Sequence, residues 1–266
     1  MGLTSVTNIP GIMRANGFVQ GAQLMDIWFS RPAIAYPQYT PPVSSIIKMD
    51  WVLSFDRAND TYQDIIDKKI WVNPAAKAEI RKMLDRTILL PVGVRMKFGP
   101  QTGSMDQVDE DYINHRPVDG VEHSIDGLTA ALGRFDLRVL IAGTVEPGML
   151  DTWAPSTSPY DVYPHKQEAQ IVNITDVGVY AADSYDFDGL QALGIWNEDN
   201  NSASMNYFKA NEFARGREAN QYVSNDSFRD WRKSNNRGGD FRVFSDTKWT
   251  RLDPPSTFAI PTPTTV

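Results

Sequence analysis

The sequence has 266 residues, enough for one large domain or two small ones with a substantial core. Hydrophobic residues make up 41% of the chain and aromatic residues 11%, proportions typical of a globular protein and unlike those of a disordered one. The chain holds 26 basic and 33 acidic residues, a net charge of −7, and this acidic balance argues against nucleic acid as a partner. The absence of cysteine excludes disulfides, thiolate zinc sites and a cysteine nucleophile.

The N-terminal third is expected to be mainly helical. Apolar residues three or four positions apart predict a helix over residues 8–32, ended by Pro32. Residues 46–55, IIKMDWVLSF, alternate apolar and charged side chains and predict a strand. A further helix is expected to start after Asn73, which can cap it, with Pro74 at a position where the missing N–H is tolerated.

The rest of the chain is expected to be a loop-rich stretch followed by strands. Residues 91–130 are polar and glycine-rich. Apolar alternation then predicts strands over 134–145 and 171–187, and residues 238–246, GGDFRVFSD, predict a short strand opened by two glycines. The Pro/Thr-rich tail 254–266 is expected to be extended, with its last residues weakly held.

These elements predict an α+β fold in which N-terminal helices pack on a mainly antiparallel β-sheet. We expect a helical part over 1–90, a loop-rich excursion over 91–130, a β-rich part over 131–253 that carries the candidate site, and the tail 254–266, together forming one structural unit. The predicted core residues share an apolar position in these periodic patterns: Trp28, Trp51, Ile80, Leu84, Phe135, Leu137, Val139, Ile141, Val179 and Trp196.

An acidic cluster forms the first candidate site. In the stretch ADSYDFDG, the residues Asp183, Asp186 and Asp188 fall within six positions around Tyr185. One interpretation is catalytic, with Asp183, Tyr185 and Asp186 as the reacting groups. A second is a metal site in which the three carboxylates hold Mg²⁺, although the spacing lacks the first and last ligands of a calcium loop. A third is a strand that ends in a turn, which Asp and Gly favour.

A basic run forms the second candidate site. Residues 228–242, FRDWRKSNNRGGDFR, interleave arginines with aromatic residues, and Arg229 and Arg232 could bind a phosphate of a substrate through bidentate contacts. The alternative is a solvated helix end before the two glycines. The sequence has no phosphate loop and no nucleophile elbow, and its three histidines lack zinc-site spacing.

Several of these stretches together resemble an uncharacterised bacterial domain family. They are IPGIMRANGF, LMDIWF, FDLRVLIAG, ITDVGVYAADSYDFDGLQALGIWN and FRDWRKSNNRGGDFRVFSD. The resemblance extends from about residue 8 to 250, and its motifs are fairly specific. That family is associated with gene neighbourhoods of type VI secretion spike proteins, so the resemblance implies a secretion-linked role.

A shorter stretch is similar to another group of proteins. Asp183-Ser184-Tyr185-Asp186 matches the D-x-Y-D core of colicin M-type toxins, which cleave the lipid-linked peptidoglycan precursor in the periplasm. The His-Arg pair that follows that core in the family is missing here, where the chain reads Ala192-Leu193-Gly194. The departure leaves no residue that obviously replaces the histidine.

Two classes of function follow from these resemblances. The first is a secreted antibacterial effector that hydrolyses a phosphodiester-type bond in the target cell envelope. The second is a non-enzymatic module, either a secretion adaptor bound to the spike or an immunity protein that binds a toxin partner. No cationic and apolar leader opens the chain, so we expect no signal peptide, residence in the bacterial cytoplasm before export, and delivery to the periplasm of a target cell. No apolar run is long enough for a membrane span.

Overall fold

The computed structural model describes residues 5–87, 94–100, 102–120, 125–155, 162–189, 192–204 and 222–262. The chain divides into two compact units, each assembled from three separate stretches of sequence. Unit 1 comprises Met1–Thr61, Pro117–Leu137 and Ala181–Asp246. Unit 2 comprises Tyr62–Arg116, Arg138–Tyr180 and Thr247–Val266. The boundaries between the units therefore do not follow the four consecutive segments expected from the sequence.

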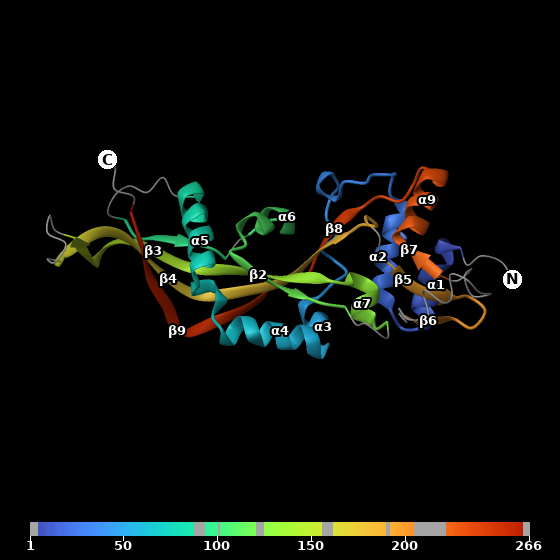
Figure 1. Cartoon of the computed structure of the whole chain (residues 1–266), viewed down its shortest axis with the longest axis horizontal. Coiled ribbons are helices and arrows are strands. Elements are labelled where there is room, and N and C mark those ends of the chain that lie inside the picture. Colours follow the sequence, from blue (N-terminus) through green and yellow to red (C-terminus); the bar gives the residue numbers. More distant parts are fainter. Residues whose placement is uncertain are drawn as a thin grey trace. The chain divides into compact units, whose positions relative to one another are not determined.

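Unit 1 is built around helices, with a small three-stranded sheet and the strand β8 (Phe241–Phe244), which pairs with the end of β4 (Val162–Tyr185). Figure 1 shows α1 and α2 side by side, and α2 also contacts α7. The helices of this unit are α1 (Ile9–Ala15), α2 (Val19–Ser30), α3 (Met49–Val52), α7 (Gly127–Leu132) and α9 (Asn225–Asn235). Its strands are β5 (Ala192–Asn197), β6 (Ser202–Ser204), β7 (Tyr222–Ser224) and β8 (Phe241–Phe244), and β5 pairs antiparallel with both β6 and β7.

Unit 2 contains most of the large sheet. Its strands are β1 (Met96–Phe98), β2 (Asn114–Val118), β3 (Phe135–Pro155), β4 (Val162–Tyr185) and β9 (Lys248–Pro261), and β2, β3 and β4 run on into unit 1. β1 pairs antiparallel with β3, and β9 pairs antiparallel with β4. The helices are α4 (Asp56–Asp67), which starts in unit 1, α5 (Pro74–Thr87) and α6 (Met105–Val108).

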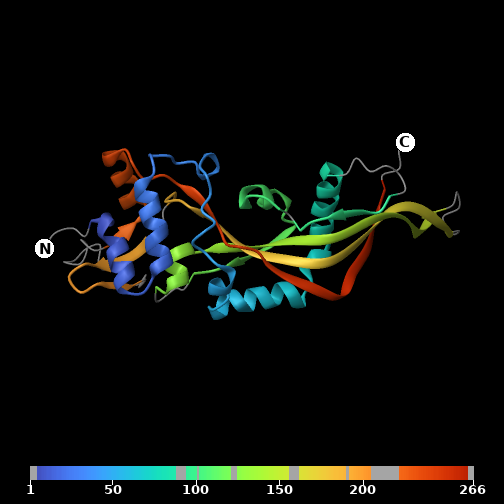
Figure 2. The same cartoon turned by 180° about the vertical axis from the view of Figure 1, so that it is seen from behind.

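Two helices of unit 2 pack beside β9, as Figures 1 and 2 show from opposite sides. Tyr62 of α4 forms a hydrogen bond to Thr250 with 3.0 Å between the two hydroxyl oxygens. Lys77 of α5 places its ammonium 4.8 Å from the centre of the Phe258 ring. Within the described residues, no helix is long and apolar enough to cross a membrane.

The predicted fold class is confirmed: the protein is α+β with a mainly antiparallel sheet. The predicted helix start at Asn73 is also confirmed, because the Asn73 side-chain oxygen accepts a hydrogen bond from the Ala76 N–H at 2.8 Å and α5 follows. The predicted strands over 134–145 and 171–187 correspond to parts of β3 and β4. Of the predicted core residues, all but the half-buried Trp51 are buried.

The single helix predicted over residues 8–32 is instead two helices. The backbone of Gly17 adopts φ 77°, a left-handed conformation that glycine takes readily and that a continuing helix does not allow. Three preceding carbonyls, among them those of Ile12 and Met13, accept hydrogen bonds from the Asn16 and Gly17 N–H groups, which closes α1. The chain then turns into α2.

The strand predicted over residues 46–55 was wrong, because this stretch contains α3. Met49 and Val52 are buried three positions apart, which places them on one helical face. The N–H of Met49 donates to the Asp246 carboxylate at 2.7 Å, so the cap of this helix comes from a residue 197 positions away. A local pattern cannot reveal such a cap.

Two further expectations concern the loop-rich stretch and the tail. The stretch 91–130 contains α6, β1, β2 and the start of α7 in addition to loops. The tail from residue 254 is extended, as expected, and it forms part of β9 as far as Pro261, where it pairs with Ala169 of β4. The prolines 254 and 255 lie opposite a register shift between Ile174 and Asp176, at which their missing N–H groups interrupt no ladder pair.

Candidate functional site

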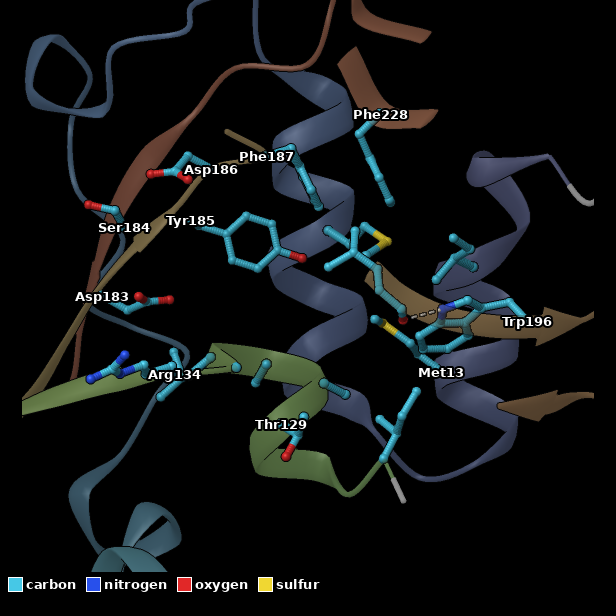
Figure 3. Close-up of a pocket in the computed structure, with 18 residues that line it drawn as sticks. Met13, Thr129, Arg134, Asp183, Ser184, Tyr185, Asp186, Phe187, Trp196 and Phe228 are labelled. Carbon is cyan, nitrogen blue, oxygen red and sulfur yellow. Dashed lines mark hydrogen bonds between the residues drawn. The ribbon is translucent and has the colours of Figure 1, made fainter. Parts of the chain in front are cut away.

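Unit 1 contains a partly open cavity of about 380 Å³ at the end of β4 (Figure 3). Its walls come from α1, α2, α7, α9, β5 and the end of β4. Most lining residues are apolar: Ile9, Met13, Met25, Ile125, Ala130, Ala131, Leu132, Phe187, Leu193, Trp196 and Phe228. The other lining residues are Thr129, Gly133, Arg134, Asp183, Ser184, Tyr185 and Asp186. The polar side chains are therefore concentrated on the β4 wall.

The end of β4 presents alternate side chains to the cavity. Asp183 and Tyr185 pair with Val243 and Phe241 of β8, and residues two apart in a strand share a face. Figure 3 shows the Asp183 carboxylate and the Tyr185 ring on the cavity side of the strand, with Ser184 on the other side. The Tyr185 ring stacks on Phe241 with 5.1 Å between the ring centres.

The Tyr185 hydroxyl is neutral and directed into the cavity (Figure 3). The residue is 8% exposed, and burial raises its pKa well above the ordinary value, with further contributions from the carboxylates of Asp183 and Asp26. No hydrogen bond joins this hydroxyl to another group within the described part of the chain. The group is thus available to donate to or accept from a ligand.

Asp186 has different neighbours. Burial raises the pKa of its carboxyl, the Asp188 carboxylate raises it further, and the hydrogen bond from the Asp188 N–H and the charge of Arg232 oppose the increase. The charge of Asp186 also acts on Asp240. Asp186 therefore interacts electrostatically with the ion pair formed by Arg232 and Asp240.

That ion pair is buried beneath α9. The Asp240 side chain is 0% exposed and accepts hydrogen bonds from the Arg232 guanidinium and, at 2.8 Å, from the Trp28 indole N–H. Burial raises the pKa of Asp240 to about 6, although Trp28 and Arg232 favour the charged form. The Arg232 guanidinium also lies 5.2 Å from the Trp28 ring centre. Arg232 is thus a structural residue of the unit 1 core.

Arg229 holds the loop that follows β4. Its guanidinium donates to the carbonyl oxygens of Phe187 at 2.7 Å and Gly189 at 2.8 Å, and it pairs with Asp226 one helical turn earlier. The Asn225 side-chain amide donates to the carbonyl oxygen of Asp188 at 2.5 Å. The first turn of α9 therefore fixes the backbone of residues 187–189.

The contact between α9 and residues 187–189 places two aromatic rings, Phe187 and Phe228, against the cavity. Phe187 stacks face to face on Phe228, with 3.8 Å between ring centres and an interplanar angle of 2°. Phe187 also contacts the edge of Trp28. On another wall, the Trp196 indole N–H donates to the Leu193 carbonyl oxygen at 2.9 Å, which satisfies its polar atom and leaves the ring as an apolar surface.

The residues predicted from the sequence thus lie in three environments. Asp183, Tyr185 and Asp186 all line the cavity, whereas Asp188 is exposed and does not line it. Arg229 and Arg232 bind groups of the protein itself. No group of three or more His, Asp or Glu side chains that could hold a metal ion occurs among the described residues. His123 lies outside those residues, and so does the side chain of His165.

The sequence patterns did not indicate that the apolar residues of the cavity walls belong to a site. Met13, Met25, Trp196 and Phe228 occur in patterns typical of core positions, and Trp196 was predicted as core. Helix periodicity identifies a buried face but not whether the space beside it is filled. The clustering of two methionines with aromatic residues near the β4 end depends on the tertiary fold.

The chain matches a known protein family. DUF6402, a family of unknown function, matches residues 4–260. No curated protein and no solved structure is similar enough to the chain to count as a match. Because the family match covers nearly the whole sequence, the chain belongs to the DUF6402 family.

Proposed function

We propose that the protein is a non-enzymatic binding module whose unit 1 cavity receives an apolar group of a ligand or partner. The observation that carries the proposal is the cavity itself, about 380 Å³ in volume and lined mainly by methionine, aromatic and aliphatic side chains. Small-molecule sites in proteins commonly have this size, with a few polar groups that orient the ligand. Here those groups are on the β4 wall, at Asp183 and Tyr185.

The state of the two arginines supports binding over phosphodiester hydrolysis. Hydrolysis of such a bond needs cations directed at the charge that develops on the phosphate oxygens. Arg229 donates to backbone carbonyls, and Arg232 pairs with a fully buried carboxylate. Neither arginine is among the residues that line the cavity.

The resemblance to domains encoded near type VI secretion spike genes supplies the setting. In that setting the protein acts as an adaptor bound to the spike or as an immunity protein bound to a toxin. A net charge of −7 favours a basic surface on the partner. Co-purification with the products of adjacent genes, repeated with a variant whose cavity is filled, tests whether the cavity takes part in such a complex.

The binding proposal is tested with 1-hexanol as a neutral probe of the cavity. We expect a saturable increase in the melting temperature of the full chain. Leu193→Trp, which adds bulk to a lining residue, should remove the increase, and Ala130→Leu provides a second filling variant on a different wall. Met149→Trp adds bulk at an exposed position in unit 2 and should leave the increase unchanged. An equal response in the filled variants and the wild type would overturn the proposal.

Hydrolysis remains a second candidate because the three residues predicted as catalytic, Asp183, Tyr185 and Asp186, line one cavity. Under this proposal, expression in the periplasm harms the cell and Asp183→Asn removes the harm while thermal stability stays nearly unchanged. Harm in neither the cytoplasm nor the periplasm would count against it.

A further inference from the structure

We infer that the ligand of the unit 1 cavity is an uncharged, mainly apolar molecule with an oxygen, of a hydroxyl or a carbonyl group, that forms a hydrogen bond with the Tyr185 hydroxyl. This inference rests on the proposed binding function and names the chemical class of the ligand. It follows from a buried hydroxyl that is held rigidly in a cavity whose other walls are mainly apolar.

Tyr185 ends β4, and its side chain is buried although it carries a polar group. The residue is 8% exposed, and Figure 3 shows its oxygen directed into the cavity, toward the walls that carry Met13 and Trp196. No hydrogen bond joins this oxygen to another group in the part of the chain that the structure describes. Because a buried hydroxyl without a partner is unfavourable, a ligand oxygen that pairs with it here would stabilise the complex.

The ring that carries this hydroxyl is held from two sides. It stacks on Phe241 of β8 with 5.1 Å between the ring centres and an interplanar angle of 14°. Phe187 contacts it edge to face with 5.7 Å between the ring centres, and Phe187 is itself stacked on Phe228 of α9. A hydroxyl fixed in this way loses little freedom when it binds a ligand, so its hydrogen bond contributes more to affinity.

The two other hydroxyls of the described lining do not compete with Tyr185 for a ligand. The Thr129 hydroxyl accepts a hydrogen bond from Arg57 at 3.1 Å. The Ser184 side chain lies on the opposite side of the strand from the Tyr185 ring (Figure 3). Tyr185 is therefore the hydroxyl that is both directed into the cavity and able to pair with a ligand.

The charged side chains of the lining favour an uncharged ligand. Arg134 is 72% exposed and pairs with Asp119 at 3.2 Å, and Figure 3 shows its guanidinium turned away from the apolar walls. Asp183 already has an interaction within the protein, so its charge is not free for a cation. The Asp186 carboxylate accepts a hydrogen bond from the Asp188 N–H at 3.5 Å. A charged group loses hydration in such a cavity and needs a free partner of opposite charge to offset that loss.

The remaining walls fit the hydrocarbon part of the ligand. Met13 and Met25 are flexible side chains that adapt to an irregular or unbranched apolar group. The Trp196 indole N–H is satisfied by the Leu193 carbonyl oxygen, so its ring acts as an apolar surface together with that of Phe228. The ligand therefore has its oxygen at β4 and its hydrocarbon part against these walls.

Three probes of similar size test the inference on the full chain by isothermal titration calorimetry: 1-hexanol, 2-hexanone and toluene, of which toluene has no oxygen. Tyr185→Phe removes only the hydroxyl and should leave the melting temperature close to that of the wild type. We expect the variant to bind the oxygen-containing ligand class about fivefold more weakly, the effect of one neutral hydrogen bond, and to bind toluene with unchanged affinity.

Tyr36→Phe is the matched control. Tyr36 is a 61% exposed tyrosine of unit 1 that does not line the cavity, so loss of its hydroxyl should leave all three affinities unchanged. An equal loss in both variants would overturn the inference. So would an equal loss for toluene and the two oxygen probes in Tyr185→Phe, because the hydrogen bond would then not be the cause.

The outcomes separate this inference from the binding proposal. If none of the three probes binds, both fail. If the probes bind but Tyr185→Phe changes none of the affinities, the cavity is a binding site and the role assigned to Tyr185 is wrong.

The two oxygen probes also identify the group on the ligand. A loss for 1-hexanol alone supports a ligand hydroxyl that donates to Tyr185, and a loss for 2-hexanone alone supports a carbonyl that accepts from it. A loss for both supports an acceptor oxygen that alcohols and ketones share.

Two charged analogues test whether the ligand is uncharged. Hexanoate and hexylammonium should each bind more weakly than 1-hexanol, because neither finds a free partner of opposite charge among the described lining residues. Tighter binding of either ion than of 1-hexanol would overturn the assignment of an uncharged ligand.

Discussion

Replacing Arg229 by methionine is expected to lower the free energy of unfolding by about 2 kcal/mol, from two lost hydrogen bonds of about 1 kcal/mol each. The guanidinium donates to the carbonyl oxygens of Phe187 and Gly189, and the side chain is 26% exposed. Methionine keeps the apolar stem of the side chain, so the change removes mainly these hydrogen bonds. The ion pair with Asp226 adds little, because that carboxylate is 60% exposed.

The assay is urea denaturation followed by tryptophan fluorescence, with linear extrapolation to water. Asp226→Asn is the control, since it removes the exposed ion pair and leaves both carbonyl contacts; we expect a loss below about 0.5 kcal/mol. If Arg229→Met is as stable as this control, the guanidinium does not hold the loop. The structural role would then be refuted and the phosphate-binding role predicted from the sequence would regain support.

Three further predictions concern the cores of the two units. Gly238→Ala should destabilise the protein by about 2 kcal/mol or more in urea denaturation, because φ is 98° and the new Cβ would lie 2.4 Å from the Trp28 ring; wild-type stability would contradict this. Burial raises the pKa of Asp240 from 3.8 to about 6, so the folded state binds the proton more tightly than the unfolded state does. The stability contributed by this group should therefore increase by roughly 2–3 kcal/mol as the pH falls from 7 to 4. An equal pH dependence of stability in Asp240→Asn would argue against this assignment. Tyr180→Phe should lower stability by about 1.5 kcal/mol, because it removes a 2.6 Å hydrogen bond to the Asp109 carboxylate; an unchanged urea midpoint would refute that contact.

Local signals were sufficient for part of the fold. The start of α5 was predicted because Asn73 and Pro74 are adjacent to the helix they initiate. The strands β3 and β4 were predicted because one face of each is consistently apolar. By contrast, α3 was missed because its cap is Asp246, far away in the sequence.

The candidate site, like the fold, could be predicted only in part from the sequence. Strand alternation correctly places Asp183 and Tyr185 on one side of β4, and both line the cavity. The burial of Arg232's partner could not be predicted, because the fully buried Asp240 also accepts a hydrogen bond from Trp28 of α2, which lies 212 positions away in the sequence. A charged residue in a sequence shows its capacity to bind a ligand, but not whether the protein's own groups already occupy it.

The most direct test of the central claim, that the unit 1 cavity binds an apolar ligand, is methionine-methyl NMR during a titration with 1-hexanol. Met13 and Met25 line the cavity, whereas Met149 is 55% exposed in unit 2. Binding in the cavity predicts saturable shifts of the Met13 and Met25 methyl resonances with one shared dissociation constant, and no saturable shift of Met149. Linear shifts of all three resonances, without saturation, would contradict the claim.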